Sequence, residues 1–343
     1  MVERERVRVG IIGAGRIGRL HAGHLASRIP EARLVAIADV NREAAARCAH
    51  DYGIEADTDD YRELLALPDL APVVVCSSTD THATLIAAAA AAGKHVFCEK
   101  PIALDLPAID RALAAVERAG VKLQIGFNRR FDANAREVRE AVAAGRVGAP
   151  QLLRITSRDP APPPPAYIAV SGGIFLDMTI HDFDLARHLL GDEVAEVYAT
   201  GGVLIDPAIG AAGDLDTAVT TLRFAGGALG MIDNSRQAVY GYDQRVEVFG
   251  SGGMVATANN LPHHAALSDA SGVHTAKPLY FFLERYAESY VAEMRAFVAA
   301  IRDDRPTPVT GADGRMAVVL GLAAQKSVAE NRPVRLDEID PSR

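Results

Sequence analysis

The first 125 residues alternate short apolar runs with longer segments of helical periodicity, and this alternation limits the folds open to the chain. The apolar runs cover residues 7–12, 34–38, 73–76, 95–98 and 122–125. The helical patterns cover residues 16–27, 42–52, 61–67, 81–92, 106–119 and 132–144. Apolar strands separated by helices are typical of a parallel sheet covered on both faces. We therefore expect an α/β protein whose residues 1–126 form a doubly wound, Rossmann-type domain.

The pattern changes after about residue 150. Longer strands with alternating polarity are expected at 151–157, 194–200, 217–224, 228–234 and 245–249, with helices at 174–190, 284–302 and 314–330. Five prolines between Pro160 and Pro165 predict a stiff loop, because proline fixes φ and lacks an amide hydrogen. Residues 127–343 are therefore expected to form an α+β domain with an open, mostly antiparallel sheet.

Charge and composition narrow the possible partners. The chain has 343 residues and a formal net charge of −8 at pH 7, which disfavours nucleic acid and anionic membranes. No apolar run reaches the ~18 residues that cross a bilayer, and the first residues lack the apolar stretch of a signal peptide. The three cysteines, Cys48, Cys76 and Cys98, are scattered and fit a reducing compartment. We therefore expect a cytoplasmic protein.

A glycine-rich turn joins the first apolar run to the first helical segment. Gly13, Gly15 and Gly18 have the G-x-G-x-x-G spacing of dinucleotide-binding turns, in the required strand-to-helix context. Gly13 permits the tight turn, Gly15 lets the backbone approach a pyrophosphate, and Gly18 allows close packing of helix and strand. Arg16 and Ile17 complete the candidate phosphate-binding segment. A tight turn without a ligand is the alternative that this context makes weaker.

Further candidate cofactor residues follow the later apolar runs. Asp39 can accept both ribose hydroxyls of adenosine and would repel a 2′-phosphate, which favours NAD over NADP. Arg42 lies close enough in the sequence to soften that repulsion, and Asp39 can instead cap the following helix. Ser78, Thr79 and His82 follow the apolar run at 73–76 and are expected to line the nicotinamide half of the cofactor site. For His82, a surface histidine at a helix start is an equally good interpretation. The remaining cofactor candidates are Val40, Glu99 and Lys100.

A lysine follows the apolar run at residues 95–98. Glu99, Lys100 and Pro101 lie at the carboxyl end of this predicted strand, where open α/β sheets bind ligands. The proline stiffens the backbone beside the lysine, and a cis peptide bond there would aim the lysine more sharply. The alternative is a solvated lysine in a surface turn.

An aspartate and a histidine form the densest polar pair within an apolar segment. Asp177 and His181 are four residues apart, so they share a face of the helix predicted at 174–190. A histidine beside a carboxylate is held in one orientation and can take a proton near neutral pH. The alternatives are a first-turn acid with a buried core histidine, and a metal site that includes Asp182. Adjacent residues point to different faces of a helix, so the geometry for a metal is poor.

The glycine turn, the Glu99–Lys100–Pro101 motif and residues 172–184 together resemble the Gfo/Idh/MocA oxidoreductase family. Residues 126–132, 156–160, 233–236, 240–245 and 281–286 are similar to its branch that oxidises cyclic polyols. The resemblance covers nearly the whole chain and implies NAD-dependent oxidation of a small-molecule polyol, without a metal. Dehydrogenases of another polyol or an aldose, NAD-dependent glycoside-cleaving relatives and NAD-binding regulators are the alternatives.

The resemblance also implies roles for individual residues. Lys100, Asp177 and His181 match the catalytic lysine, aspartate and histidine of the family. In the implied mechanism His181 takes the hydroxyl proton, Asp177 orients His181, and Lys100 donates to the developing alkoxide.

A second set of residues resembles the family's substrate-pocket positions, which also include the three catalytic residues. This set is Asn128, Arg129, Asp159 and Tyr240. A salt-bridged Arg129 and a sheet aromatic at Tyr240 are the alternative interpretations. The open sheet is similar to the surface through which family members associate, which implies a homo-oligomer, by analogy a tetramer.

Overall fold

The computed structural model describes residues 6–341, and the chain divides into two compact units. The first unit contains the chain up to Asn128 together with Glu288–Met316. The second contains Arg129–Ala287 and the chain from Ala317 onward. The chain first passes from one unit to the other after Asn128, close to the domain boundary predicted at residue 126. The second domain was predicted as one continuous segment, residues 127–343. The structure instead returns residues 288–316 to the first unit.

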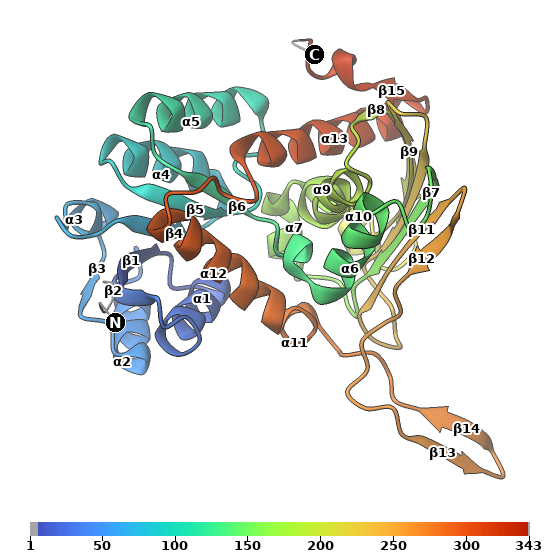
Figure 1. Ribbon diagram of the computed structural model, residues 1–343, viewed down its shortest axis with the longest axis horizontal. Coiled ribbons are helices and arrows are strands. Elements are labelled where there is room, and N and C mark those ends of the chain that lie inside the picture. The colour runs from blue at the N-terminus through green and yellow to red at the C-terminus, as the bar shows by residue number, and fades with distance from the viewer. Residues whose placement is uncertain (1–5, 342–343) are drawn as a thin grey trace. The chain divides into compact units, whose positions relative to one another are not determined.

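The first unit is a parallel sheet between two layers of helices (Figure 1). Its strand order is β3-β2-β1-β4-β5-β6. The strands are β1 (Val7–Ile12), β2 (Ala32–Ala38), β3 (Ala56–Thr58), β4 (Pro72–Val75), β5 (His95–Glu99) and β6 (Leu123–Gly126). The order reverses between β1 and β4, and ligands of doubly wound sheets bind at such a switch point. The predicted Rossmann-type fold is confirmed.

Helices cover both faces of this sheet. They are α1 (Arg16–Ser27), α2 (Arg42–Tyr52), α3 (Tyr61–Leu65), α4 (Thr79–Ala91), α5 (Leu106–Ala119) and α12 (Ala287–Arg302). In Figure 1, α1, α2 and α12 lie on one side of the sheet and α4 and α5 on the other. Met294 and Phe297 of α12 are fully buried in the core cluster that contains Ile11 and Phe97. This apolar face explains why a C-terminal segment belongs to the first unit.

The second unit is built on a seven-stranded sheet with the order β12-β11-β7-β10-β9-β8-β15. The strands are β7 (Pro150–Arg158), β8 (Val194–Gly202), β9 (Thr217–Phe224), β10 (Leu229–Ser235), β11 (Asp243–Gly250), β12 (Gly253–Ala256) and β15 (Val334–Arg335). Only the β7–β10 pair is parallel among the described pairs of this sheet, so the predicted, mostly antiparallel sheet is confirmed. A hairpin of β13 (Ala266–Asp269) and β14 (Gly272–Thr275) projects from this unit, with every residue exposed.

The helices of the second unit are α6 (Ala133–Ala143), α7 (Pro165–Ser171), α8 (Gly173–Asp177), α9 (Thr179–Leu190), α10 (Pro207–Ala211), α11 (Phe282–Arg285) and the later part of α13 (Gly311–Glu330). They depart from the predicted pattern at four places, of which the first is α10, where no helix was predicted. The proline run leads into α7, because proline is compatible with a first helical turn. The helix predicted at 174–190 divides at Met178, and that predicted at 284–302 divides at Tyr286. None of the described helices is long and apolar enough to span a bilayer.

Candidate active site

The three motif glycines of the first unit have different physical tasks. Gly13 has a φ of +108°, and a Cβ there would lie 2.6 Å from the backbone of Cys76. A Cβ on Gly18 would lie 1.9 Å from the carbonyl oxygen of Gly13, so these two glycines are required by the fold itself. A Cβ on Gly15 would meet nothing within 4 Å, so Gly15 faces open space.

The N-terminus of α1 suits a phosphate group. Gly15 is its N-cap, no side chain among the described residues caps it, and its first turn carries no acidic residue. The amide groups there have the partial positive charge that binds a pyrophosphate. Arg16 is exposed and Ile17 packs against the core. The glycine turn therefore fits the dinucleotide that its sequence predicts.

Asp39 connects the glycine turn to the end of β2. Its Oδ2 accepts from the amide of Ala14 at 2.6 Å, and its Oδ1 accepts from the amide of Asn41 at 2.8 Å. Asn41, and not Asp39, caps α2, so the capping interpretation of Asp39 is wrong. Arg42 pairs with Asp57 at 3.2 Å. Asp39 therefore lies at the end of β2 in contact with the glycine turn, and the next residue, Val40, is exposed.

His82 links α4 to the turn that follows β5. Its side chain is buried, and its Nδ1 lies 2.8 Å from the carbonyl oxygen of Pro101. Its Nε2 lies 3.1 Å from the carbonyl oxygen of Ser77. The surface-histidine interpretation is therefore wrong, and His82 contacts the lysine turn from one side. Ser78 is the N-cap of α4 and Thr79 begins the helix, so both lie at the carboxyl edge of the sheet.

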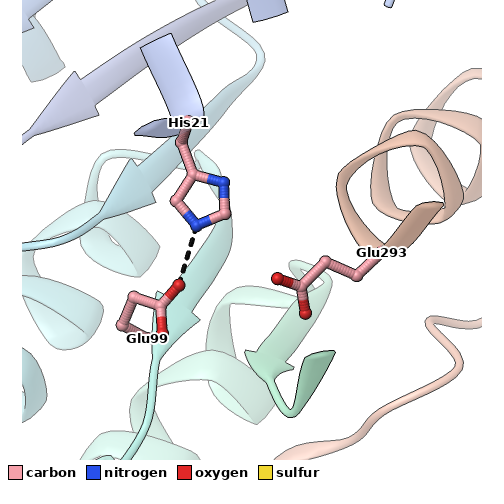
Figure 2. Close-up of side chains that lie close together, drawn as sticks. All are labelled: His21, Glu99 and Glu293. Atoms are coloured by element: carbon pink, nitrogen blue, oxygen red, sulfur yellow. Dashed lines mark hydrogen bonds and ion pairs between the residues drawn. The ribbon is translucent and has the colours of Figure 1, made fainter. Parts of the chain in front are cut away.

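The lysine turn is held from its other side by His21. Glu99 Oε1 lies 2.7 Å from His21 Nε2, and the next residue, Lys100, is half-buried (Figure 2). The peptide bond between Lys100 and Pro101 is cis. Sequence reasoning missed His21, although it shares the buried face of α1 with Gly18 and Leu25, where a polar residue calls for a partner.

Asp177 is the last residue of α8, and His181 lies in the first turn of α9. The break at Met178 means that the two residues do not share one uninterrupted helix, as their spacing predicted. Asp177 Oδ1 accepts from the hydroxyl of Tyr167 at 2.8 Å, and its Oδ2 lies 3.4 Å from Arg236 Nη1. Both Asp177 and His181 are half-buried.

Arg236 was missed by sequence reasoning. It is almost fully buried and also pairs with Asp214 at 3.1 Å. A buried arginine needs such carboxylates, so its pairing stabilises Asp177 as an anion. Its sequence signals are its place two residues after the strand predicted at 228–234 and its membership of the segment 233–236 that resembles the family, but no role was assigned to it from them.

Asp159 follows β7 and is half-buried. Burial raises its pKa to about 7, the positive charge of Arg129 opposes this shift, and the negative charge of Asp177 adds to it. Asp159 therefore changes its charge near neutral pH, and it interacts electrostatically with Asp177.

Arg129 is buried in an ion pair. Its Nη1 lies 2.5 Å from Asp182 Oδ1 and donates to Ser157 at 3.2 Å. Asn234 donates to the other oxygen of Asp182 at 2.8 Å. The structure thus has the salt-bridged arrangement that was the alternative for Arg129. Because Asp182 is paired with Arg129 and Asn234, its carboxylate is already occupied, which argues against the alternative in which Asp182 is a metal ligand.

The last two predicted pocket residues belong to different units. Asn128, in the first unit, is buried and donates to Ser289 at 3.5 Å. Tyr240, in the second unit, is 39% exposed. Its hydroxyl donates to Asp243 at 2.6 Å and accepts from Arg158 at 3.2 Å.

These features define a class of protein. The first unit has the switch point, the glycine turn and a carboxylate after β2 that nicotinamide dinucleotides require. The second unit has an anchored carboxylate, Asp177, at the end of α8 and a histidine, His181, in the first turn of α9, and these residue types suit proton transfer. The protein is an NAD-binding oxidoreductase of the Rossmann type.

The chain belongs to the Gfo/Idh/MocA oxidoreductase family. Residues 7–127 match the model of the oxidoreductase family's NAD-binding Rossmann fold, and residues 135–256 match a GFO/IDH/MocA C-terminal domain. The myo-inositol 2-dehydrogenase of Thermotoga maritima is 53% identical over 97% of this chain and 99% of its own length. The predicted family and cofactor are confirmed.

Two solved structures show the same fold. A probable dehydrogenase from Thermotoga maritima has a TM-score of 0.95 and 53% identity, over 97% of this chain and 99% of that chain. The scyllo-inositol dehydrogenase from Lactobacillus casei, with bound NAD(H) and scyllo-inositol, has a TM-score of 0.90 and 31% identity. That match also covers 97% of this chain and 99% of the other.

Proposed function

We propose that the protein is an NAD-dependent inositol 2-dehydrogenase that oxidises myo-inositol to 2-keto-myo-inositol. One observation carries this proposal: a relative named for this activity matches 53% of the aligned residues over nearly the full length of both chains. The residues that the proposed chemistry needs, Lys100, Asp177 and His181, are all present.

The proposed reaction removes two hydrogens from one CH–OH group. NAD, when bound, accepts the carbon-bound hydrogen as hydride. The imidazole of His181 takes the hydroxyl proton, so the C–O bond becomes a carbonyl. The ammonium group of Lys100 donates to the oxygen as negative charge develops there, a contact that strengthens toward the transition state.

The contacts of Asp177 support its proposed role of orienting His181. Tyr167 and Arg236 hold its carboxylate in place, so its negative charge favours the imidazolium formed by proton transfer. Asp159 supports a polyol pocket, because a half-buried carboxyl group can accept from ring hydroxyls. Asn128, Arg129 and Tyr240 are proposed to complete the pocket, Arg129 by orienting its neighbours from its ion pair.

We also propose a homotetramer that covers the open face of the second unit's sheet. Met254, Phe249, Leu152 and Leu229 are paired neighbours on successive strands and form one exposed apolar row. Such rows on an open sheet favour a protein partner over water. Light scattering on the wild type and on Phe249→Glu, which places a charge in this row, tests the proposed tetramer. A monomeric wild type would refute it.

A cytoplasmic location is proposed as well. All three cysteines lie within the described residues as buried, free thiols, which fits a reducing compartment. Recovery of the protein in a secreted or periplasmic fraction would contradict this location.

NADH absorbance tests the proposed activity. Purified protein and NAD are mixed with myo-inositol, scyllo-inositol or glucose, and each mixture is repeated with NADP. The strongest rise is expected with NAD and myo-inositol. A rise with another polyol alone would reassign the substrate, and NAD binding without any turnover would refute the dehydrogenase.

A further inference from the structure

Three ionisable side chains meet inside the first unit beside the lysine turn. His21 comes from α1, Glu99 from the end of β5 and Glu293 from α12 (Figure 2). One side-chain nitrogen or carboxyl oxygen of each residue lies within 4.8 Å of the corresponding atoms of the other two. His21 and Glu293 are fully buried, and the side chain of Glu99 is 13% exposed. The cluster therefore connects the helix of the glycine turn, the residue before Lys100 and the returning C-terminal helix.

Glu293 stands out in this cluster. Neither of its carboxyl oxygens has a hydrogen-bond partner among the described residues, and Figure 2 shows the group directed toward His21 and Glu99. Its backbone carbonyl accepts from Gln124 Nε2 at 3.1 Å, which ties this turn of α12 to β6. An unpaired, fully buried carboxylate is very costly, so its protonation state follows from its neighbours.

Two buried carboxyl groups this close do not both ionise. Glu99 Oε1 lies 2.7 Å from His21 Nε2 and the side chain has some solvent contact, so a negative charge is better stabilised on Glu99 than on Glu293, whose carboxyl oxygens have no partner among the described residues. Burial, and then the charge of Glu99, raise the pKa of Glu293 well above its ordinary value. Other ionisable groups also lie near the cluster. Burial keeps the thiols of Cys76 and Cys98 neutral by raising their pKa values. Burial, and then the charge of His21, lower the pKa of His24 to about 4, and the ring of Tyr290 packs edge-on against His21 at 5.8 Å.

We propose that Glu293 is a positioning residue that stays protonated, so that Glu99 is the only anion of the cluster. A neutral Glu293 leaves the Glu99–His21 hydrogen bond intact, and that bond fixes the backbone from which Lys100 extends. Ionisation of Glu293 would push Glu99 away from this position by charge repulsion. The cluster thus couples the cofactor helix to the lysine turn, and its effect on catalysis rests on the function proposed above.

A neutral isostere tests the proposal. Glu293→Gln preserves shape and lacks the proton that can be lost, whereas Glu288→Gln changes an exposed residue of the same helix and is the control. At alkaline pH, where Glu293 would lose its proton, the NAD affinity of the wild type is expected to fall by about tenfold more than that of Glu293→Gln. The infrared difference spectrum of the wild type minus Glu293→Gln is expected to show the carbonyl band of one protonated carboxylic acid near neutral pH, because the other protonated carboxyl groups, such as Asp159, are common to both proteins.

Neither measurement needs turnover, so they separate this inference from the proposed activity. Loss of inositol oxidation with both results intact would refute only the activity. Superimposable pH profiles of NAD affinity for wild type and Glu293→Gln, or no protonated carboxyl band in the difference spectrum, would overturn the positioning role. A stoichiometric metal ion, detected by elemental analysis and lost in Glu293→Gln, would also overturn it.

Discussion

The hydroxyl of Tyr167 donates a 2.8 Å hydrogen bond to Asp177, the residue proposed to orient His181. Tyr167 lies on α7, directly after the proline run, and its side chain is partly exposed. The proline run therefore leads into a helix that supports the candidate active site, a function that its composition alone does not reveal.

Tyr167→Phe removes this donor and leaves the ring. A hydrogen bond to a charged group contributes about 1.5–3 kcal/mol when lost, and exposure reduces the effect, so we expect kcat to fall about 3- to 10-fold. Steady-state kinetics with NAD and myo-inositol measure it. Tyr280→Phe, an exposed tyrosine elsewhere in the second unit, is the matched control. Unchanged kcat in Tyr167→Phe would show that Asp177 does not need this bond.

Gly15→Ala and Gly18→Ala are expected to fail for different reasons. A methyl group on Gly15 has open space and an ordinary φ of −70°, so the free protein should keep its Tm while NAD affinity falls by about tenfold or more. A methyl group on Gly18 would collide with the backbone of Gly13. This overpacking should lower the free energy of unfolding by about 1–3 kcal/mol or more, and with it the Tm of the free protein. Thermal unfolding and NAD titration of both variants check this. Equal losses of Tm would contradict the distinction.

Asp39→Asn keeps the shape of Asp39 and removes its charge. Because a carboxylate favours ribose hydroxyls and repels a 2′-phosphate, we expect the ratio of kcat/KM for NAD over NADP to fall by about tenfold or more. Asp51→Asn, on the surface of α2, should leave the ratio unchanged. A ratio that stays constant in Asp39→Asn would mean that another residue selects NAD.

The charge of Asp159 should make stability depend on pH. Its folded-state pKa of about 7 exceeds the ordinary value of 3.8, so the folded protein holds a proton that the unfolded chain loses. The contribution of this proton to the free energy of unfolding is fully present below about pH 4 and is lost as the pH rises through about 7. The Tm of Asp159→Asn minus that of the wild type should therefore increase from about pH 5 to about pH 8. A constant difference would mean that Asp159 is ionised throughout this range.

Lys100→Met and His181→Ala test the proposed chemistry directly. Each should lower kcat by ~10²-fold or more while NAD still binds, because each removes a group that acts in the transition state. Paired titrations of NAD and measurements of turnover separate binding from chemistry. Near-normal turnover in either variant would refute its assigned role.

Sequence patterns predicted the features that depend on neighbours along the chain. The period of apolar residues marked most strands of both sheets, although the short strands β3, β12 and β15 were not predicted. The glycine turn showed its function because Gly13 and Gly18 have no room for a Cβ, while Gly15 between them faces open space. Pattern reasoning assigned α12 to the wrong domain, because an apolar helix face does not say which core it joins.

The sequence by itself therefore determined the fold class, the glycine turn and the residue types available for chemistry, since these follow from local periodicity and backbone sterics. Only the tertiary structure decided which charges meet. Arg129 pairs with Asp182, Arg236 holds Asp177, and Glu293 returns to His21 and Glu99. Such partners lie 53 or more residues apart, and long-range packing, not local pattern, selects among the many carboxylates of the chain.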